Sequence, residues 1–242
     1  MTFKIWRGPG GGRAGAAAVA VTSVSFVLSP LFSAGFRGFT PAQFPVLAER
    51  WPVQPAGWAF SIWGLIYLAL LAGAALGWLR HAEDADWRPM RLPLALSLGL
   101  GTFWIALANR APVLATALIL FMAAFALAAF LRAPRAGAAL WPAGLYAGWL
   151  VAASAVAVAV VLSGHGVLGA QASAYLALAV TLGLGARLIW LRPAPGFALA
   201  LIWALFGITM ANRAPLNLPV AALAGLGGLA LAGLWLWRAR AR

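Results

Sequence analysis

The chain has 242 residues, of which 64% are hydrophobic and only 9% are charged. About a quarter of the residues in a soluble domain are charged. This composition therefore excludes a soluble domain and indicates a polytopic membrane protein. The absence of cysteine excludes disulfides and thiolate metal sites. The net charge of +13 comes from single basic residues between apolar runs, which argues against a nucleic-acid partner and for residues that set membrane topology.

Apolar runs divide the chain into eight candidate membrane spans. A helix needs about 20 residues to cross a bilayer, and the third and seventh runs are the shortest of the eight. We therefore predict an all-α transmembrane helix bundle of about eight spans. These cover residues 14–35, 57–79, 92–109, 112–132, 140–162, 169–191, 195–211 and 217–237.

Basic residues are distributed unequally between the two ends of these spans. Eight spans place both termini on one side, and 13 of the 17 Lys and Arg residues fall on that side, against 4 on the other. Cytoplasmic loops are enriched in Lys and Arg, so we expect both termini in the cytoplasm. The membrane we expect is a bacterial inner membrane.

Ionisable residues avoid the centres of all eight predicted spans. Ion-coupled pumps need such buried groups as relays or ion sites, so the pattern argues against a pump. It also leaves no usual arrangement of acid, base and nucleophile, so we expect no enzyme and no catalytic residue. His81 and His165 lie in different loops and are expected to be solvated rather than metal ligands.

The pentapeptide ANRAP occurs twice, at residues 108–112 and 211–215. Asn tolerates the left-handed conformation that often ends a helix, and Pro is favoured in the first turn of the next one. We therefore predict two tight turns on the same outer face, with Pro112 and Pro215 in the first turns of the following helices. Two explanations stay open for the repeat: a duplicated four-helix unit, or convergent turn chemistry.

Aromatic residues in the second run predict a specialised helix face. Phe60, Trp63 and Tyr67 are spaced i, i+3, i+7 and share one face, while Trp58 lies roughly opposite as an interface anchor. Tyr67 is about 15 Å into the span, deeper than the aromatic belts of membrane interfaces. Such a face is typical either of packed core aromatics or of the wall of a pocket for a flat apolar ligand.

The same stretch resembles the second helix of the tryptophan-rich sensory protein and translocator protein family, also called peripheral-type benzodiazepine receptor-like proteins. The family motif reads Pro-Pro-x-Trp-Val-Phe-x-Pro-Val-Trp-x-x-Leu-Tyr. Matching residues occur here in the same order, although the inner Pro is missing and the interval from Phe to the second Trp is one residue shorter. They are Pro55, Trp58, Phe60, Trp63 and Tyr67.

Weaker matches to the family follow in the third and fifth runs. The third helix of the family carries Leu-Asn-x-x-Trp, and this chain keeps Leu100 and Trp104 but has Gly101 in place of Asn. The fifth helix carries Tyr-x-x-Trp, which Tyr146 and Trp149 match. The resemblance covers residues 14–165 and implies a five-helix translocator-protein-like bundle there. The charge pattern and the apolar runs add a basic cytoplasmic N-terminus at 1–13, and three additional transmembrane helices with a basic C-terminus at 166–242.

The resemblance also implies binding of a flat hydrophobic ligand such as a tetrapyrrole, for instance a porphyrin, in a sensory, regulatory or transport role. No cofactor is required, and the expected partners are membrane lipids, the small ligand, and a second copy of the chain or a larger membrane complex. The implied pocket wall consists of Phe60, Trp63, Tyr67, Trp104, Tyr146 and Trp149. Candidate contacts for ligand carboxylates are Arg37, Arg50 and Arg110 on the outer side.

Two further functions are compatible with the sequence. A structural or assembly subunit of a larger, pigment-containing membrane complex would use the aromatic and small residues as contacts. A permease built from two four-helix halves would account for the repeated pentapeptide, and the lack of buried charges would require a neutral or apolar solute.

The charge asymmetry predicts that reporters fused after Arg242 stay in the cytoplasm, whereas reporters in the loop that contains His165 are exported. Paired alkaline phosphatase and fluorescent protein fusions measure both positions. An exported C-terminal reporter would contradict the orientation and the even number of spans together.

Overall fold

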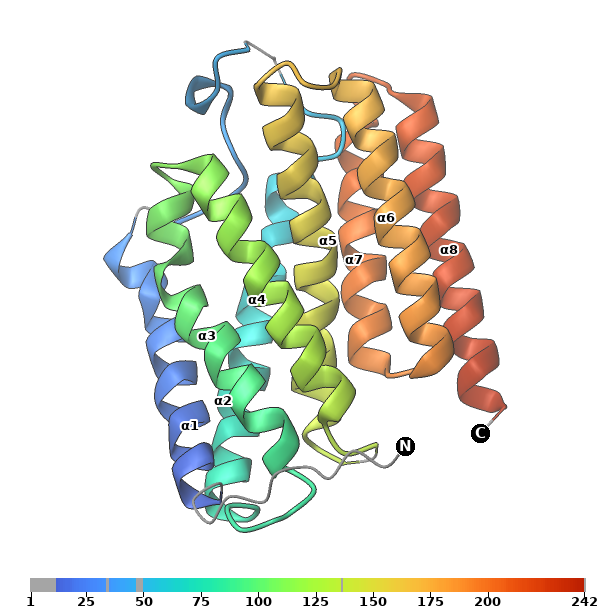
Figure 1. Cartoon of the computed structure of the whole chain (residues 1–242). Coiled ribbons are helices and arrows are strands. Elements are labelled where there is room, and N and C mark those ends of the chain that lie inside the picture. Colours follow the sequence, from blue (N-terminus) through green and yellow to red (C-terminus); the bar gives the residue numbers. More distant parts are fainter. Residues whose placement is uncertain (1–11, 34, 47–49, 136, 242) are drawn as a thin grey trace, which may run out of the picture.

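The structure is a computed structural model that describes residues 12–33, 35–46, 50–135 and 137–241. Within these residues the chain forms eight α-helices and no strand, which confirms the predicted all-α class (Figure 1). The helices are α1 Arg13–Leu28, α2 Ile62–Leu79, α3 Arg88–Ala108, α4 Pro112–Arg132, α5 Leu140–Gly164, α6 Ala170–Leu191, α7 Pro195–Ala211 and α8 Leu218–Arg240.

Seven of these helical segments are long and apolar enough to cross a membrane. Helix α7 has 17 residues, and at 1.5 Å per residue it is about 25 Å long, shorter than the hydrocarbon core of a bilayer. It lies beside α5 and α8 within the bundle, and about half of its residues are buried. A short helix is tolerated at this position because neighbouring protein, rather than lipid, surrounds much of its backbone.

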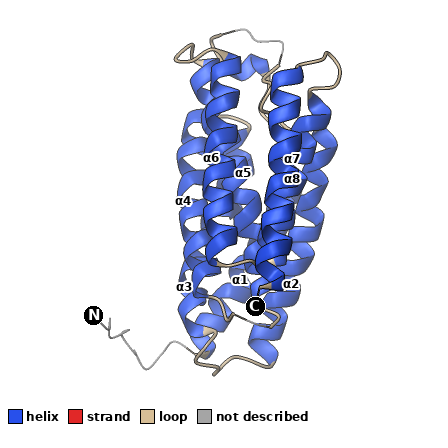
Figure 2. Cartoon of the chain, turned by 90° about the vertical axis from the view of Figure 1, so that its right-hand side faces the viewer, coloured by secondary structure: helices blue, strands red, loops and turns tan. Residues whose placement is uncertain are grey.

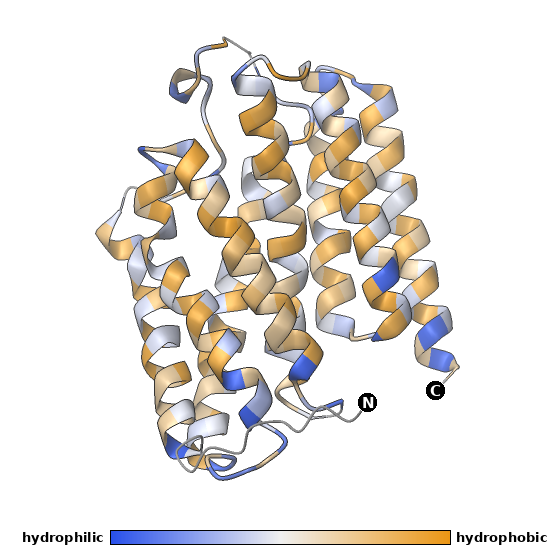
Figure 3. Ribbon diagram, viewed as in Figure 1, coloured by the Kyte–Doolittle hydropathy of each residue, from blue (hydrophilic) through white to orange (hydrophobic). Residues whose placement is uncertain are grey.

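Consecutive helices run in opposite directions, so the start of α1 and the end of α8 lie at the same end of the bundle (Figures 1 and 2). The ribbon is mostly hydrophobic along the helices, with hydrophilic residues concentrated near the helix ends (Figure 3). This is the arrangement that the eight apolar runs predict. Which end faces the cytoplasm stays a prediction.

Helices α5 and α7 approach each other closely through glycine. A Cβ atom added at Gly148 would lie 2.5 Å from the carbonyl oxygen of Phe197 and 3.1 Å from its Cα. A Cβ at Gly196 would lie 2.6 Å from the carbonyl oxygen of Trp141. Because backbone atoms on both sides leave no room, these glycines are required for the contact between the two helices.

Two buried arginines hold loops at the end of the bundle where the described termini lie. Arg192 donates to the carbonyl oxygens of Leu131 and Pro134, at 2.7 and 2.8 Å, and its guanidinium lies over the Phe130 ring. Leu131 lies in the last turn of α4 and Pro134 just after it, where helix geometry provides no donor for the carbonyl oxygens. Arg91 similarly donates to three carbonyl oxygens, those of Gly12, His81 and Ala82. Both residues therefore stabilise loops, beyond any role in topology.

The two ANRAP turns lie at the same end of the bundle, as predicted (Figure 1). Pro112 begins α4, but the prediction for Pro215 was wrong, because α8 begins only at Leu218. Asn217 caps α8 instead, accepting a hydrogen bond from the Val220 amide at 3.4 Å. Neither Asn of the repeat is left-handed, since the φ angles of Asn109 and Asn212 are −74° and −99°.

The close contact between α5 and α7 predicts unequal effects of two Gly→Ala substitutions. Gly148→Ala should destabilise the protein by about 1–3 kcal/mol, because its methyl group would overlap backbone that cannot move aside. Gly183→Ala on α6 is the matched control, since a Cβ there meets nothing within 4 Å. The control should be neutral or stabilising by up to about 1 kcal/mol, because Ala is the better helix former. Thermal unfolding in detergent measures both, and equal melting temperatures would contradict the prediction.

Candidate functional site

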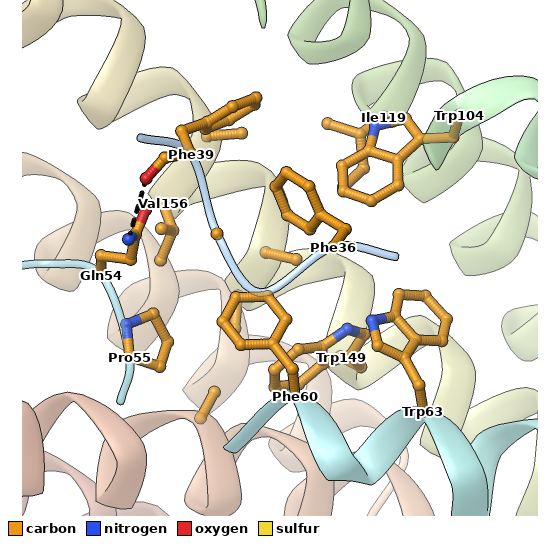
Figure 4. A pocket seen from close by; sticks show the side chains of 15 residues that line it. Phe36, Phe39, Gln54, Pro55, Phe60, Trp63, Trp104, Ile119, Trp149 and Val156 are labelled. Carbon is orange, nitrogen blue, oxygen red and sulfur yellow. Dashed lines mark hydrogen bonds between the residues drawn. The ribbon is translucent and has the colours of Figure 1, made fainter. Parts of the chain in front are cut away.

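An apolar cavity lies beneath the loop that joins α1 to α2, in the half of the bundle away from the start of α1 and the end of α8 (Figure 4). Its volume is about 30 Å³, room for roughly two water molecules at 10–15 Å³ each. The wall combines residues of α3, α4, α5, α7 and the start of α2 with residues of the loop. The lining residues are Phe36, Gly38, Phe39, Gln54, Pro55, Phe60, Trp63, Trp104, Ile119, Trp149, Ala152, Ala153, Val156, Ala157 and Ala204.

Four of the six aromatic residues predicted for the wall line this cavity: Phe60, Trp63, Trp104 and Trp149. They come from segments far apart in the sequence. Trp149 meets Phe60 and Trp63 edge to face, with ring centroids 5.8 and 6.1 Å apart. The indole N–H of Trp104 donates to the carbonyl oxygen of Ala115 at 3.0 Å, which fixes this ring in the wall. The structure thus brings together the aromatic residues that helical spacing and the family motif singled out.

The other two predicted wall residues, Tyr67 and Tyr146, are not among the lining residues, which corrects the prediction. Phe26 of α1 lies against both of them edge to face, with ring centroids 5.4 and 5.8 Å apart. The Tyr146 hydroxyl is hydrogen bonded to Ser97 Oγ at 2.9 Å. Tyr146 is therefore part of the packed core next to the cavity, and Tyr67 is partly buried and packs against that core.

Gly101 explains how Phe26 reaches this position. A Cβ atom at Gly101 would lie 2.6 Å from Cε2 of Phe26 and 3.1 Å from Cε of Met122. An Asn here, as in the family motif, would therefore collide with the Phe26 ring. Phe26 is only 1% exposed, so its ring fills the volume that this glycine leaves. The Gly in place of Asn was the sequence signal for a ring supplied by another helix.

The roof of the cavity comes from the loop between α1 and α2, and its residues were missed by the sequence analysis. Phe36 points between Trp104 and Phe60, with ring centroids 4.8 and 5.8 Å away (Figure 4). It is flanked by Gly35 and Gly38, whose φ angles of +71° and +111° favour glycine. The two glycines around an aromatic residue were the available signal. We call residues 35–46 and 50–56 the roof segment.

The first ANRAP turn holds the beginning of the roof segment. The Asn109 side-chain amide donates to the Gly35 carbonyl oxygen at 3.2 Å, and this contact is exposed to solvent. Gln43 of the roof donates in return to the carbonyl oxygen of Ala108, the first residue of the repeat, at 2.8 Å.

The second ANRAP turn holds the end of the roof segment more firmly. Asn212 is fully buried, and its amide donates to the carbonyl oxygens of Pro52 and Ile208 at 2.7 and 2.8 Å. Arg50 of the roof donates to the carbonyl oxygens of Ala211 and Pro215, both at 2.8 Å. The repeated pentapeptide therefore anchors the roof at both of its ends, with unequal strength.

The three arginines predicted to pair with ligand carboxylates are not lining residues of the cavity. Arg50 is used by the second ANRAP turn. Arg37 and Arg110 are exposed. Their role as contacts for ligand carboxylates stays a prediction.

Trp58 faces away from the aromatic cavity, as its position on the helix predicted. It is 46% exposed and packs edge to face on Trp203 of α7, with centroids 5.4 Å apart. The Trp203 N–H donates to the carbonyl oxygen of Ala59 at 2.8 Å. Trp58 and Trp63 therefore lie on different sides of the start of α2, and they form a natural pair for comparison.

A bundle of apolar helices around an aromatic cavity, closed at one end by a loop, defines an integral membrane protein of the all-helical class. A family model of TSPO-like proteins matches residues 38–235. The chain belongs to this TSPO-like protein family. The match continues through α6 and α7 and most of α8, beyond the part at 14–165 on which the resemblance was based. No curated protein and no solved structure matches the chain.

The unequal anchors of the roof predict unequal effects of two Asn→Ala substitutions. Asn212→Ala removes a buried donor from two carbonyl oxygens and should cost about 1–3 kcal/mol of unfolding free energy. Asn109→Ala removes an exposed hydrogen bond and should cost about 0.5 kcal/mol or less. Thermal unfolding measures the total cost, and hydrogen exchange of residues 50–56 locates it. Equal losses, or faster exchange at 50–56 in Asn109→Ala alone, would contradict the assignment of the firmer anchor.

Proposed function

We propose that this protein binds a flat hydrophobic ligand of the tetrapyrrole kind in the aromatic cavity, with a sensory, regulatory or transport role rather than an enzymatic one. The observation that carries the proposal is the convergence of Phe60, Trp63, Trp104 and Trp149 on one apolar space. Flat aromatic walls suit a flat ligand, since rings stack and meet edge to face at separations of about 4.5–7 Å.

Ligand entry requires the cavity to enlarge, because about 30 Å³ is far less than the volume of any polycyclic molecule. Phe36 is the lining residue best suited to move. It belongs to the roof segment rather than to a helix, and the two flanking glycines allow the backbone to adopt other conformations. A ligand ring would replace the Phe36 ring against Trp104 and Phe60, so binding restores the aromatic packing that opening of the roof disrupts.

The membrane setting of the proposal follows from the basic residues. With both termini in the cytoplasm of a bacterial inner membrane, the roof segment lies at the outer face. A ligand would then reach the cavity from the outer side of the bilayer, or from its outer leaflet. The assembly-subunit and permease functions stay predictions, and native mass after gentle purification and solute flux into liposomes distinguish them.

The proposal predicts that Trp63→Leu weakens binding of a metal-free porphyrin by about two- to tenfold. One aromatic contact is worth about 0.5–1.5 kcal/mol beyond buried area, and 1.4 kcal/mol is a factor of ten. Quenching of tryptophan fluorescence by the porphyrin, with the protein in lipid nanodiscs, measures the dissociation constant.

Trp58→Leu is the matched control, because it removes the same side chain from the other side of the same helix start. It should leave porphyrin affinity nearly unchanged, and Tyr67→Phe should as well, since Tyr67 does not line the cavity. Equal affinity in wild type and all three variants would mean that the aromatic cavity is packing and not a binding site.

A further inference from the structure

The ends of α6 and α8 carry positive charge that the rest of the chain does not neutralise. The sequence has no Asp or Glu after Asp86, although most of its arginines lie beyond that residue. In the loop between α2 and α3, Glu83 pairs with Arg13 and Arg88 at 3.5 and 3.3 Å. Helices α6 and α8 lie on the other side of the bundle from this loop (Figure 1). Within the described part of the chain, their arginines therefore have no carboxylate side chain as a partner.

Arg238 of α8 is held in one orientation against the end of α6. Its Nε and Nη2 both donate to the carbonyl oxygen of Trp190, at 3.2 and 3.0 Å. Its guanidinium carbon lies 4.6 Å from the centre of the Trp190 ring and 5.9 Å from that of the Trp237 ring. A side chain fixed in this way loses little further conformational freedom when it binds a partner.

These contacts leave most of the donors of Arg238 available. A guanidinium has five N–H groups, and the bonds to Trp190 use two of them along the edge of Nε and Nη2. The edge between Nη1 and Nη2 has no partner among the described residues, and the side chain is only half-buried. Arg192 differs, because it is buried and donates to three carbonyl oxygens. Arginine stacks through its faces and donates through its edges, so the two Trp rings do not block the available edge.

Arg238 and the two tryptophans lie where the bundle meets the membrane interface. Helices α6 and α8 are each long and apolar enough to span a bilayer, and Trp190 and Trp237 lie in their last turns. The two residues are 44% and 55% exposed. Exposed tryptophans at the ends of spans are typical of the zone where lipid headgroups meet acyl chains. An acceptor that reaches Arg238 from this zone is therefore part of a lipid.

Two further arginines add positive charge beside Arg238. Arg187 is exposed one turn before Trp190 on the same face of α6, and Arg240 is exposed two residues after Arg238. Within the described residues, neither of these two side chains makes a hydrogen bond or an ion pair. Phosphate is the lipid group that matches this set, because a guanidinium edge donates two parallel N–H groups to it.

We propose that the ends of α6 and α8 form a binding site for an anionic glycerophospholipid, whose phosphate accepts from the available edge of Arg238. Arg187 and Arg240 strengthen the attraction, and the Trp190 and Trp237 rings lie against the glycerol and the first acyl carbons. A zwitterionic lipid fits less well, because it brings its own ammonium group to three arginines. This site is separate from the aromatic cavity and does not depend on ligand binding there.

The test compares phosphatidylglycerol with phosphatidylethanolamine carrying identical acyl chains. Native mass spectrometry of the full chain, released from detergent micelles, gives the dissociation constant of each lipid. In wild type, phosphatidylglycerol should bind about three- to tenfold more tightly, the range expected for about one additional charge contact. Excess glycerol 3-phosphate should not displace it. Equal affinities, or displacement by the soluble phosphate, overturn the proposal.

Arg238→Gln removes the charge and keeps a side-chain amide that can still donate to the Trp190 carbonyl oxygen. The preference for phosphatidylglycerol should fall below about twofold, since the remaining arginines are not held in place. Arg213→Gln is the matched control, because it makes the same change at an exposed arginine at the other end of the bundle. The control should keep the wild-type ratio. A ratio that survives in Arg238→Gln, or that falls equally in both variants, overturns the proposal.

Photolabelling of the wild-type protein locates the lipid without any substitution, and so decides the question even if Arg238→Gln does not fold. Phosphatidylglycerol with a diazirine next to its headgroup should label peptides that contain residues 187–191 and 234–241. The corresponding phosphatidylethanolamine should label them several-fold less. Equal labelling by the two lipids, or label spread evenly over the ends of all the helices, means diffuse attraction to the bilayer and overturns the proposal.

Discussion

The satisfaction of backbone carbonyl groups in apolar surroundings is the constraint on which the rest of this structure depends. Helices satisfy their own interior, but their ends and the loops between them cannot. The chain meets this need with few polar residues: Arg91 and Arg192 at one end of the bundle, and Arg50, Asn109 and Asn212 at the other. With so few charged and amide side chains available, their positions determine which loops are held in place, and hence where a roof over the cavity can form.

Two phenylalanines divide the aromatic interior into a fixed part and an adaptable part. Phe26 belongs to α1, fills the space beside Gly101, and touches Trp63, Tyr67 and Tyr146. Phe36 makes comparable ring contacts but belongs to the roof segment. Ring contacts at these separations have similar energies. Moving the Phe26 backbone would require moving a helix, whereas moving the Phe36 backbone requires moving only a loop. The cavity therefore lies on the side of Phe36, and the side of Phe26 remains a core.

The sequence was sufficient to predict the helices and much of the aromatic wall, because both follow from local periodicity. The spacing of Phe60 and Trp63 places them on one helix face without knowledge of any other segment. The roof could not be predicted, because Phe36 lies in a loop without periodicity. Two of the hydrogen bonds that hold this loop join residues whose sequence separations are 74 and 160 positions. The prediction that Pro215 lies in the first turn of the following helix failed for a related reason. Asn217, two residues further on, caps α8 instead, and the local sequence does not decide which of the two residues begins the helix.

The contacts of the repeated pentapeptide bear on its origin. In a duplicated four-helix unit, the turn between α7 and α8 would correspond to the turn between α3 and α4, and the loop between α5 and α6 to the loop between α1 and α2. Asn109 contacts the α1–α2 loop through Gly35, so its counterpart should contact residues 165–169. Asn212 instead donates to Pro52, in the same α1–α2 loop. The two Asn side chains thus bind the same loop, one through an exposed amide and the other through a buried amide. Neither binds the loop between α5 and α6, which favours convergent turn chemistry over duplication.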